Sequence, residues 1–211
     1  MAAYEILCFG DSNTWGYVPE TKGRLPRGKR WPNVFARELG KDVFVIEDGQ
    51  NGRTTVHEDP VEGHRNGKEY LIPCLQSHQP LDLVVLMLGT NDLKARFSVS
   101  AFDIGWSIQR LLEVIRDSGA GPSGRAPEVL LVAPAPLGKL TEFSDLFAGG
   151  PEKSRGLGAR YREAAELFGC SFLDAGEVVA VSDADGVHLD EAGHEALGEA
   201  VAAKVREIRK R

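Results

Sequence analysis

Apolar runs of strand length alternate with helical patterns along the whole chain. Several of these runs are apolar at consecutive positions, which is typical of parallel strands covered by helices on both faces. Strands exposed on one face would instead alternate apolar and polar residues. The pattern therefore predicts five buried parallel strands, at residues 4–9, 42–47, 81–88, 128–133 and 170–175.

Four segments between and after these runs have helical spacing. The clearest is 100–119, where Ser100 and Asp103 resemble a capping box, apolar residues follow at helical intervals, and Gly119 is a stop signal. A second segment has Pro32 in its first turn, a position that suits proline. The expected helices are 31–40, 100–119, 154–169 and the segment from Asp190 onward.

This alternation predicts an α/β fold in a single domain spanning 1–211. The simplest arrangement is a flavodoxin-like, doubly wound, five-stranded parallel sheet of order 2-1-3-4-5. Helices would flank both faces, giving three α/β/α layers with right-handed crossovers. In such sheets ligands bind beyond the carboxyl ends of the strands.

Charge and composition narrow the partners. The chain of 211 residues has a formal net charge of −6 and a sequence pI near 5.4, which argues against nucleic acid. No apolar run approaches the roughly 18 residues of a membrane span, and the start shows no signal-peptide pattern, so we expect a cytoplasmic protein without a membrane partner. Cys8, Cys74 and Cys170 lack metal or disulfide spacing, and we expect free thiols.

Polar residues collect where the predicted strands end. Four loops contain them: "GDSNTWG" from Gly10, "DGQNGRTT" from Asp48, "GTNDLK" from Gly89 and "DADGVHLD" from Asp183. Because these strands run parallel, the loops should converge on one edge of the sheet. The loop that begins at Pro134 should reach the same edge, and we assign it to the wall of a pocket.

Ser12 is the natural nucleophile at this edge, since it follows a strand and opens a helical turn whose free N–H groups can stabilise an oxyanion. A serine also needs a base. His188 alone of the five histidines lies in a strand-end loop with a carboxylate, Asp185, three residues earlier. That carboxylate can hold the imidazole in the tautomer that accepts the serine proton.

The ordered set "GDSNTWG", "GQNGRTT", "GTND" and "DGVHLD" resembles the SGNH hydrolases, also called the GDSL esterase and lipase family. The longer patterns are similar to its arylesterase and acetylesterase branch, which includes enzymes that transfer acyl groups to alcohols. The resemblance covers nearly the whole chain. It implies a catalytic triad and three oxyanion donors, namely Ser12, Asp185 and His188 for the triad and Ser12, Gly52 and Asn91 for the oxyanion hole.

One position departs from the family pattern, because Asn13 stands where the short family name has leucine. The resemblance otherwise implies a serine esterase that hydrolyses short-chain, acetyl-type esters through an acyl-enzyme. A carbohydrate deacetylase-type acetylesterase is the alternative within this class. No cofactor is implied, and the expected partner is a small-molecule ester.

Other classes of function remain open at this point. A non-catalytic nucleotide-binding domain would suit the fold, but the glycine spacings of phosphate loops are absent. A serine peptidase would share the chemistry, although nothing specifies peptide recognition. Carboxylates and imidazoles could also form a hard-metal site, from the cluster Asp183, Asp185, His188, Asp190 and His194.

Pocket and surface predictions complete the interpretation. We expect Trp15 and the segment 134–137 to form apolar walls of a small acyl pocket. The segments 18–30 and 57–70 are long connections, typical of active-site rims or subunit contacts, and the family resemblance implies a homo-oligomer. We expect solvated side chains for His57, His64 and His78. The substrate-contacting candidates are Asp11, Trp15, Pro136 and Leu137.

Overall fold

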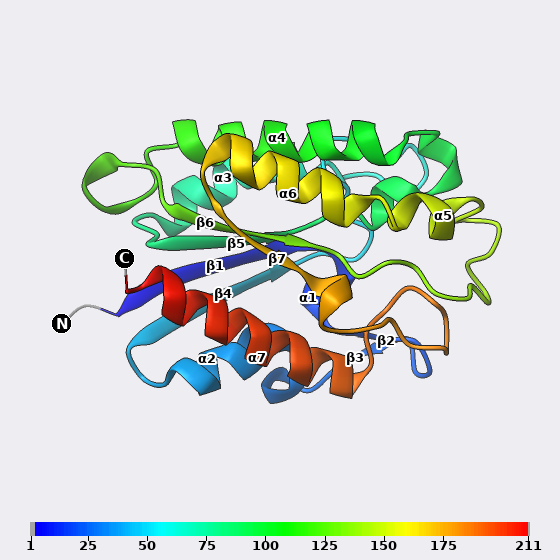
Figure 1. Cartoon of the computed structure of the whole chain (residues 1–211), viewed down its shortest axis with the longest axis horizontal. Helices are drawn as coiled ribbons and strands as arrows, with labels where there is room; N and C mark the ends of the chain where they lie inside the picture. Colours follow the sequence, from blue (N-terminus) through cyan, green and yellow to red (C-terminus); the bar gives the residue numbers. More distant parts are fainter. Residues whose placement is uncertain (1–2, 211) are drawn as a thin grey trace.

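A computed structural model describes residues 3–210 of the chain. Within this range a five-stranded parallel sheet has the order β4-β1-β5-β6-β7 (Figure 1). In chain order this is 2-1-3-4-5, so the predicted flavodoxin-like topology is confirmed. The strands are β1 (Tyr4–Gly10), β4 (Val43–Gly49), β5 (Leu83–Met87), β6 (Glu128–Ala133) and β7 (Ser171–Asp174), and a separate antiparallel pair comprises β2 (Tyr17–Val18) and β3 (Gly23–Arg24).

Helices cover both faces of the sheet and complete three layers (Figure 1). One face carries α2 (Trp31–Leu39) and α7 (Glu191–Ile208), and the other carries α3 (Gly67–His78), α4 (Ala101–Asp117) and α6 (Leu157–Phe168). The shorter elements are α1 (Ser12–Trp15), α5 (Gly150–Ser154) and the 3-10 helices η1 (Arg27–Lys29), η2 (Asn91–Leu93), η3 (Ala95–Phe97), η4 (Pro122–Gly124) and η5 (Ala175–Glu177).

Strand β1 shows why its apolar residues are consecutive. Leu7 and Phe9 point into the core beneath α3, α4 and α6, whereas Ile6 and Cys8 point into the core beneath α2 and α7. All four side chains are completely buried. Because side chains alternate between the two faces of a strand, a sheet buried on both faces needs apolar residues at every position.

The structure confirms the capping box of α4, in which Ser100 and Asp103 bond each other's backbone N–H groups. It corrects the helix expected at 154–169. That segment contains the last residue of α5 and then α6, with Gly156 between the two helices. Glycine is a poor helix former, which explains a break at this position.

Helix α3 was not predicted from the sequence. Its first residues, 67–70, fall within the segment 57–70, which was expected to be a long connection. Pro73 lies inside the helix and weakened the helical signal. A signal was nevertheless present, because Asn66 caps the helix by accepting the N–H groups of Lys68 and Glu69. Its buried face uses helical spacing, with Leu71, Cys74 and Leu75 against the sheet.

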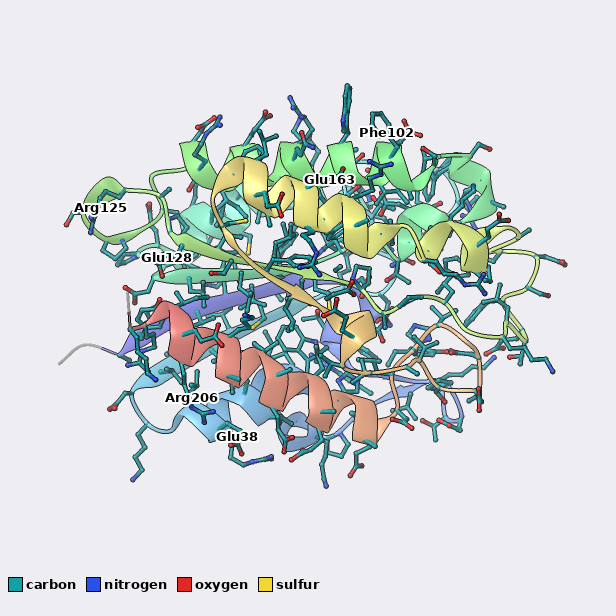
Figure 2. All side chains as sticks on the ribbon, in the orientation of Figure 1. Glu38, Phe102, Arg125, Glu128, Glu163 and Arg206 are labelled. Atoms are coloured by element: carbon teal, nitrogen blue, oxygen red, sulfur yellow. The ribbon has the colours of Figure 1, made fainter. Side chains whose placement is uncertain are left out.

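Charged side chains cover the outer surfaces of both helical layers (Figure 2). Arg206 of α7 lies beside Glu38 at the end of α2 and donates to its backbone carbonyl at 2.6 Å. Over residues 3–210, every helix is too short or too polar to cross a bilayer. The three cysteines are free thiols, as expected.

Candidate active site

Strand β1 ends at the helix that carries the predicted nucleophile. Asp11 caps α1 by accepting the Asn13 N–H at 3.0 Å, and Ser12 is the first helical residue. The N–H groups of the next three residues, Asn13, Thr14 and Trp15, all donate to Asp11, which fixes the turn that carries Ser12. Burial raises the pKa of Asp11 to about 6, although the Asn13 N–H and the neighbouring His188 oppose this rise.

The structure brings Ser12, His188 and Asp185 together. The Oγ atom of Ser12 lies 2.9 Å from Nε2 of His188, and Nδ1 of His188 lies 2.5 Å from Oδ2 of Asp185. An ionised carboxylate only accepts, so Nδ1 carries the proton and Nε2 is left to accept the serine hydroxyl. The three side chains therefore have the geometry of the proton-transfer line of a catalytic triad.

Asp185 is fixed by the turn in which it lies. Its Oδ1 accepts the backbone N–H groups of Val187 at 2.8 Å and His188 at 2.9 Å. Burial alone would raise the pKa of Asp185, but the hydrogen bonds from His188 and Val187 hold it below its usual value. Gly186 makes the turn possible, since its φ is +75° and a Cβ would lie 2.4 Å from the Lys139 carbonyl oxygen.

The two further oxyanion candidates lie on the same cavity as Ser12. Asn91 is 6% exposed and opens η2, and its Nδ2 donates to the Arg53 carbonyl at 3.1 Å. This bond fixes the side-chain amide and leaves its second N–H available. Gly52 has a φ of +80°, and a Cβ there would lie 2.3 Å from Oε2 of Glu62. The positive φ and this close contact both favour glycine at position 52.

A cavity of about 150 Å³ is lined by Ser12. One side is apolar and includes Phe143, Leu146 and Phe147, while Glu62 and Lys94 make the opposite side charged. The complete lining is Ser12, Tyr17, Asn51, Gly52, Glu62, Asn91, Lys94, Phe143, Leu146, Phe147, Val187 and His188.

Two aromatic rings pack against the His188 imidazole. The Tyr17 centroid lies 4.3 Å from that of His188, and the Phe143 ring meets it edge-on at 6.1 Å. These contacts restrict rotation of the imidazole.

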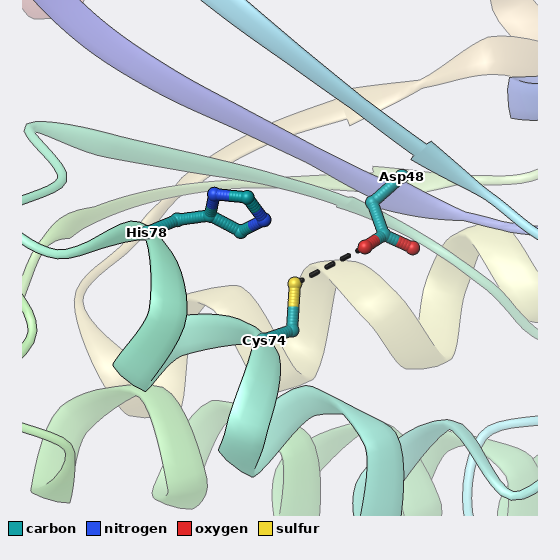
Figure 3. Close-up of side chains that lie close together, drawn as sticks. All are labelled: Asp48, Cys74 and His78. Atoms are coloured by element: carbon teal, nitrogen blue, oxygen red, sulfur yellow. Dashed lines mark hydrogen bonds between the residues drawn. The ribbon is translucent and has the colours of Figure 1, made fainter.

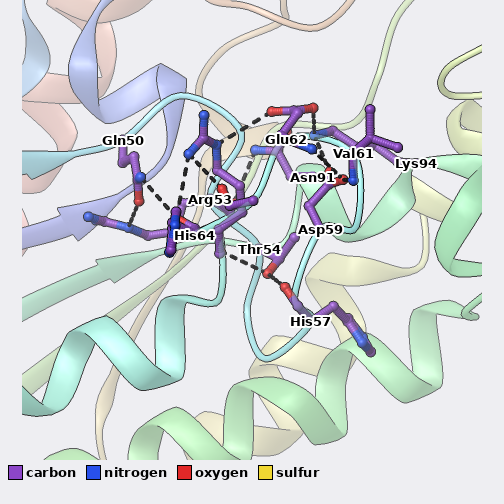
Figure 4. A network of polar contacts seen from close by, with 12 residues as sticks. Gln50, Arg53, Thr54, His57, Asp59, Val61, Glu62, His64, Asn91 and Lys94 are labelled. Carbon is purple, nitrogen blue, oxygen red and sulfur yellow. Dashed lines mark hydrogen bonds and ion pairs between the residues drawn. The ribbon is translucent and has the colours of Figure 1, made fainter.

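The charged side of the cavity is a network of ion pairs (Figure 4). The Lys94 ammonium lies 2.5 Å from Glu62 and 3.2 Å from Asp59, and Arg96 pairs with the other oxygen of Asp59 at 2.7 Å. Lys94 and Asp59 are almost completely buried. Burial works against ionised Asp59, but the Val61 and Glu62 N–H groups and the two cations hold its pKa well below the usual range.

The four substrate-contacting candidates lie elsewhere, since none of them lines this cavity over the described residues 3–210. Asp11 caps α1, and the Trp15 ring packs under the Arg24 guanidinium at 4.8 Å. Pro136 packs closely against Gly176, where a Cβ would lie 2.7 Å from the proline ring, and Leu137 is buried in the core. The loop from Pro134 does reach the cavity, but through Phe143. The choice of residues in that loop is therefore corrected.

The carboxylate and histidine cluster considered as a metal site is not assembled as a ligand set. Asp190 caps α7 by accepting the Gly193 N–H at 2.7 Å, and Nδ1 of His194 accepts the Trp31 N–H at 3.3 Å. Burial lowers the pKa of His194 to about 4, so this imidazole is neutral. Asp183 is exposed.

The three remaining histidines divide into two groups. His64 and His78 are exposed, as predicted. His57 is half-buried instead, stacked on Phe97 at 5.4 Å with Nε2 3.7 Å from a carboxylate oxygen of Asp92. The prediction of a solvated His57 is therefore wrong, because the loop that carries it packs against η3.

Sequence reasoning missed most of the cavity wall. Lys94 directly follows the "GTND" motif, and a lysine next to a strand-end motif was an available signal. Tyr17 closely follows "GDSNTWG", but its position depends on the β2–β3 hairpin. Glu62, which lines the cavity, comes from the segment 57–70 that was expected to form an active-site rim or a subunit contact.

A serine, a histidine and a carboxylate in contact at the carboxyl edge of a parallel sheet are typical of an α/β serine hydrolase. The model of the GDSL-like lipase/acylhydrolase family matches residues 8–196. The chain therefore belongs to this family and is a carboxylic ester hydrolase. The comparison with curated proteins gives no significant match.

Solved structures agree with this assignment. The native aryl esterase of M. smegmatis is 42% identical with a TM-score of 0.93, and the match covers 97% of this chain and 99% of that one. A carbohydrate acetylesterase from Sinorhizobium meliloti is 38% identical with a TM-score of 0.92 and the same coverage. A lipolytic G-D-S-L family protein from Veillonella parvula, 20% identical, covers 98% of both chains with a TM-score of 0.67 and shares the fold.

Proposed function

We propose that this chain hydrolyses short-chain, acetyl-type carboxylic esters through an acyl-enzyme on Ser12. The observation that carries the proposal is the contact of Ser12 Oγ with His188 Nε2 at 2.9 Å on the wall of a cavity of about 150 Å³. Ligand sites for drug-sized molecules commonly measure about 300 to 1,000 Å³. A cavity of this size favours a small acyl group.

In the proposed mechanism, Ser12 Oγ attacks the ester carbonyl while His188 Nε2 takes the hydroxyl proton. Asp185 stabilises the imidazolium through Nδ1. His188 then returns the proton to the leaving alcohol, and the carbonyl re-forms as the acyl-enzyme. A water molecule attacks this ester in the second half of the reaction, with His188 again taking the proton.

The carbonyl oxygen becomes negatively charged in each tetrahedral intermediate. We assign its stabilisation to the backbone N–H groups of Ser12 and Gly52 and to the Asn91 side-chain amide. Each preorganised donor contributes about 3 to 4 kcal/mol to the transition state. The Asn91 bond to the Arg53 carbonyl, at 3.1 Å, supports this role because it orients the amide before substrate binds.

The natural alcohol is a second part of the proposal. Glu62, Lys94 and Asn51 give one side of the cavity hydrogen-bonding groups, which suit an alcohol with further hydroxyls. The similarity to a carbohydrate acetylesterase supports acetylated sugars as one candidate class. The apolar side with Phe143 and Leu146 supports aryl acetates and also lets a small alcohol replace water as acyl acceptor.

The first test is hydrolysis of p-nitrophenyl esters from acetate to octanoate, with folded Ser12→Ala as the control. We expect rapid turnover confined to short acyl chains and a loss of at least about 10³-fold in kcat for the variant. Full activity in Ser12→Ala would refute the mechanism. Peracetylated monosaccharides, compared with phenyl acetate, then distinguish sugar from aryl esters, and ester formation in added ethanol measures acyl transfer.

We further propose that the chain forms a homo-oligomer through the segments 18–30 and 57–70. Val61, which is 76% exposed, supports a contact surface in the second segment. Light scattering of the wild type and Val61→Glu is the test. A monomeric mass for the wild type would refute this proposal, and the proposed catalysis does not depend on it.

A further inference from the structure

Three side chains with different metal-binding atoms meet between β4 and α3 (Figure 3). Asp48 comes from the end of β4, while Cys74 and His78 lie one turn apart on α3. Their ligand atoms all lie within 4.8 Å of one another. Among residues 3–210 this is the one group of three or more such side chains with this proximity, and it does not line the cavity over Ser12.

The spacing of the first two ligands fits a tetrahedral zinc ion. Cys74 Sγ lies 3.2 Å from Asp48 Oδ2. With zinc bonds of about 2.3 Å to sulfur and about 2.0 Å to oxygen, tetrahedral geometry places these two atoms roughly 3.5 Å apart. His78 is exposed, so its ring can rotate toward the other two ligands without disturbing the core. Positions four residues apart on a helix share one face.

The other surroundings of the cluster are compatible with an ion. Asp48 uses Oδ1 to pair with Arg53 at 2.7 Å, which leaves Oδ2 for a metal. Cys74 is 4% exposed, and burial and the neighbouring Asp48 raise its thiol pKa well above the usual range. A thiol in this state is unreactive as a nucleophile. A metal that displaces its proton would convert it into a strong ligand.

We infer that Asp48, Cys74 and His78 bind one zinc ion, with water in the fourth position. The thiol proton leaves to solvent as the sulfur–zinc bond forms. The ion then faces the thiolate and the Asp48 carboxylate, which it shares with Arg53. Sulfur and imidazole ligands select zinc over magnesium or calcium, which prefer oxygen. This inference does not depend on the proposed esterase function.

Zinc binding should also stabilise the fold near the active site. Asp48 holds Arg53, whose guanidinium donates to the Gly10 carbonyl and whose own carbonyl accepts the Asn91 amide. A ligand that binds the folded state alone raises its stability by mass action. We expect saturating zinc to raise Tm by about 5 °C in the wild type.

The test uses tag-free full-length protein, freed of metal by a chelator and then titrated with Zn²⁺ or Co²⁺. We expect one ion per chain and, with cobalt, a thiolate-to-metal absorption band in the near ultraviolet. Cys74→Ser should abolish the band. His78→Ala should weaken binding by at least about tenfold. Matched controls are Cys170→Ser and His64→Ala, which should bind like the wild type.

Three results would overturn the inference. The first two are a wild-type Kd above about 100 μM and a band that persists in Cys74→Ser. Because His78 is exposed, the His78→Ala variant tests the site even if the buried Cys74 variant fails to fold. Binding equal to wild type in His78→Ala would remove the proposed three-residue site. A Tm rise in the wild type that is absent in His78→Ala would support it.

Discussion

Asn13 joins the helix that carries Ser12 to the loop that carries His188. Its Oδ1 accepts the Leu189 N–H at 2.9 Å, and its Nδ2 donates to the Val187 carbonyl at 3.3 Å. These two backbone groups lie immediately after and before His188. The position at which the chain departs from the short family name therefore ties the proposed base to the proposed nucleophile.

Replacing Asn13 with leucine should reduce catalysis through positioning. Leucine cannot bond either backbone group, and unsatisfied buried groups cost about 1 to 3 kcal/mol each. We expect Asn13→Leu to lower kcat by about tenfold or more with little change in KM, because substrate contacts stay in place. Steady-state kinetics on a short-chain ester, at a temperature where circular dichroism shows a folded protein, measure this effect.

Asn33→Ala provides the control for Asn13→Leu. Asn33 lies on α2, and its Nδ2 has no hydrogen-bond partner among residues 3–210. This variant should keep the wild-type kcat. A folded Asn13→Leu enzyme with normal kcat would show that the two hydrogen bonds stabilise the fold without positioning His188.

The fold could be predicted because several strands are apolar at consecutive positions, which indicates a sheet buried on both faces. In β5, Leu83 to Met87 are all buried apolar residues, so a sheet covered on both faces could be inferred directly. Helix α3 gave a weaker signal because Pro73 interrupts it and its buried face holds few apolar residues. Local pattern therefore determined the sheet better than it determined the helices packed on it.

Some residues of the site could be predicted and others could not. The triad candidates could be located because they follow strand ends, and a parallel topology brings strand ends together. These candidates are Ser12, Asp185 and His188. Phe143 and Pro136 belong to one loop, yet only Phe143 reaches the cavity. Which residue of a long loop turns inward depends on tertiary packing, and a single sequence contains no periodic signal for it.

Asp11→Asn should stabilise the protein at alkaline pH. Burial raises the pKa of Asp11 to about 6, above an unfolded value near 3.9. The contribution of Asp11 to stability is therefore fully present below about pH 4 and is lost as the pH rises through about 6. Asparagine retains the helix cap without the charge. We expect a free energy of unfolding about 2 to 3 kcal/mol higher than wild type at pH 8, with no difference near pH 4.

Urea unfolding at both pH values measures this difference, and Asp145→Asn at an exposed position is the matched control. The same variant should lose several-fold in kcat/KM, because it removes the electrostatic interaction between the Asp11 carboxylate and His188. Equal stability of wild type and Asp11→Asn at pH 8 would show that the carboxylate is not destabilised by its burial.

Phe143→Ala should extend the acyl-chain range, whereas Trp15→Ala should not. Phe143 lines the cavity, and its ring meets His188 edge-on at 6.1 Å. The Trp15 ring lies instead under Arg24. One methylene in an apolar pocket changes specificity by roughly 10- to 200-fold. We expect the ratio of kcat/KM for butyrate to that for acetate to rise about tenfold in Phe143→Ala, measured with p-nitrophenyl esters. A rise of this ratio in Trp15→Ala and not in Phe143→Ala would instead place Trp15 on the pocket wall.

Lys94→Met should destabilise the fold strongly at neutral pH. The ammonium is 2% exposed and lies between Asp59 and Glu62, so its loss leaves buried Asp59 with Arg96 as its remaining cation. Removing one partner of a buried pair costs about 3 to 5 kcal/mol. Because the pKa of Asp59 is held below its usual range, the stabilisation is present at neutral pH and is lost as the pH falls through that depressed value.

Urea unfolding at pH 7 tests this expectation, with the exposed Lys139→Met as the control. Adding Glu62→Gln to Lys94→Met should restore part of the stability, since it removes a second carboxylate that has lost Lys94 and keeps a longer pair with Arg65, at 3.5 Å. A loss in Lys94→Met no larger than in Lys139→Met would mean that Arg96 alone compensates Asp59. The charged side of the cavity would then serve substrate recognition without contributing to the stability of the site.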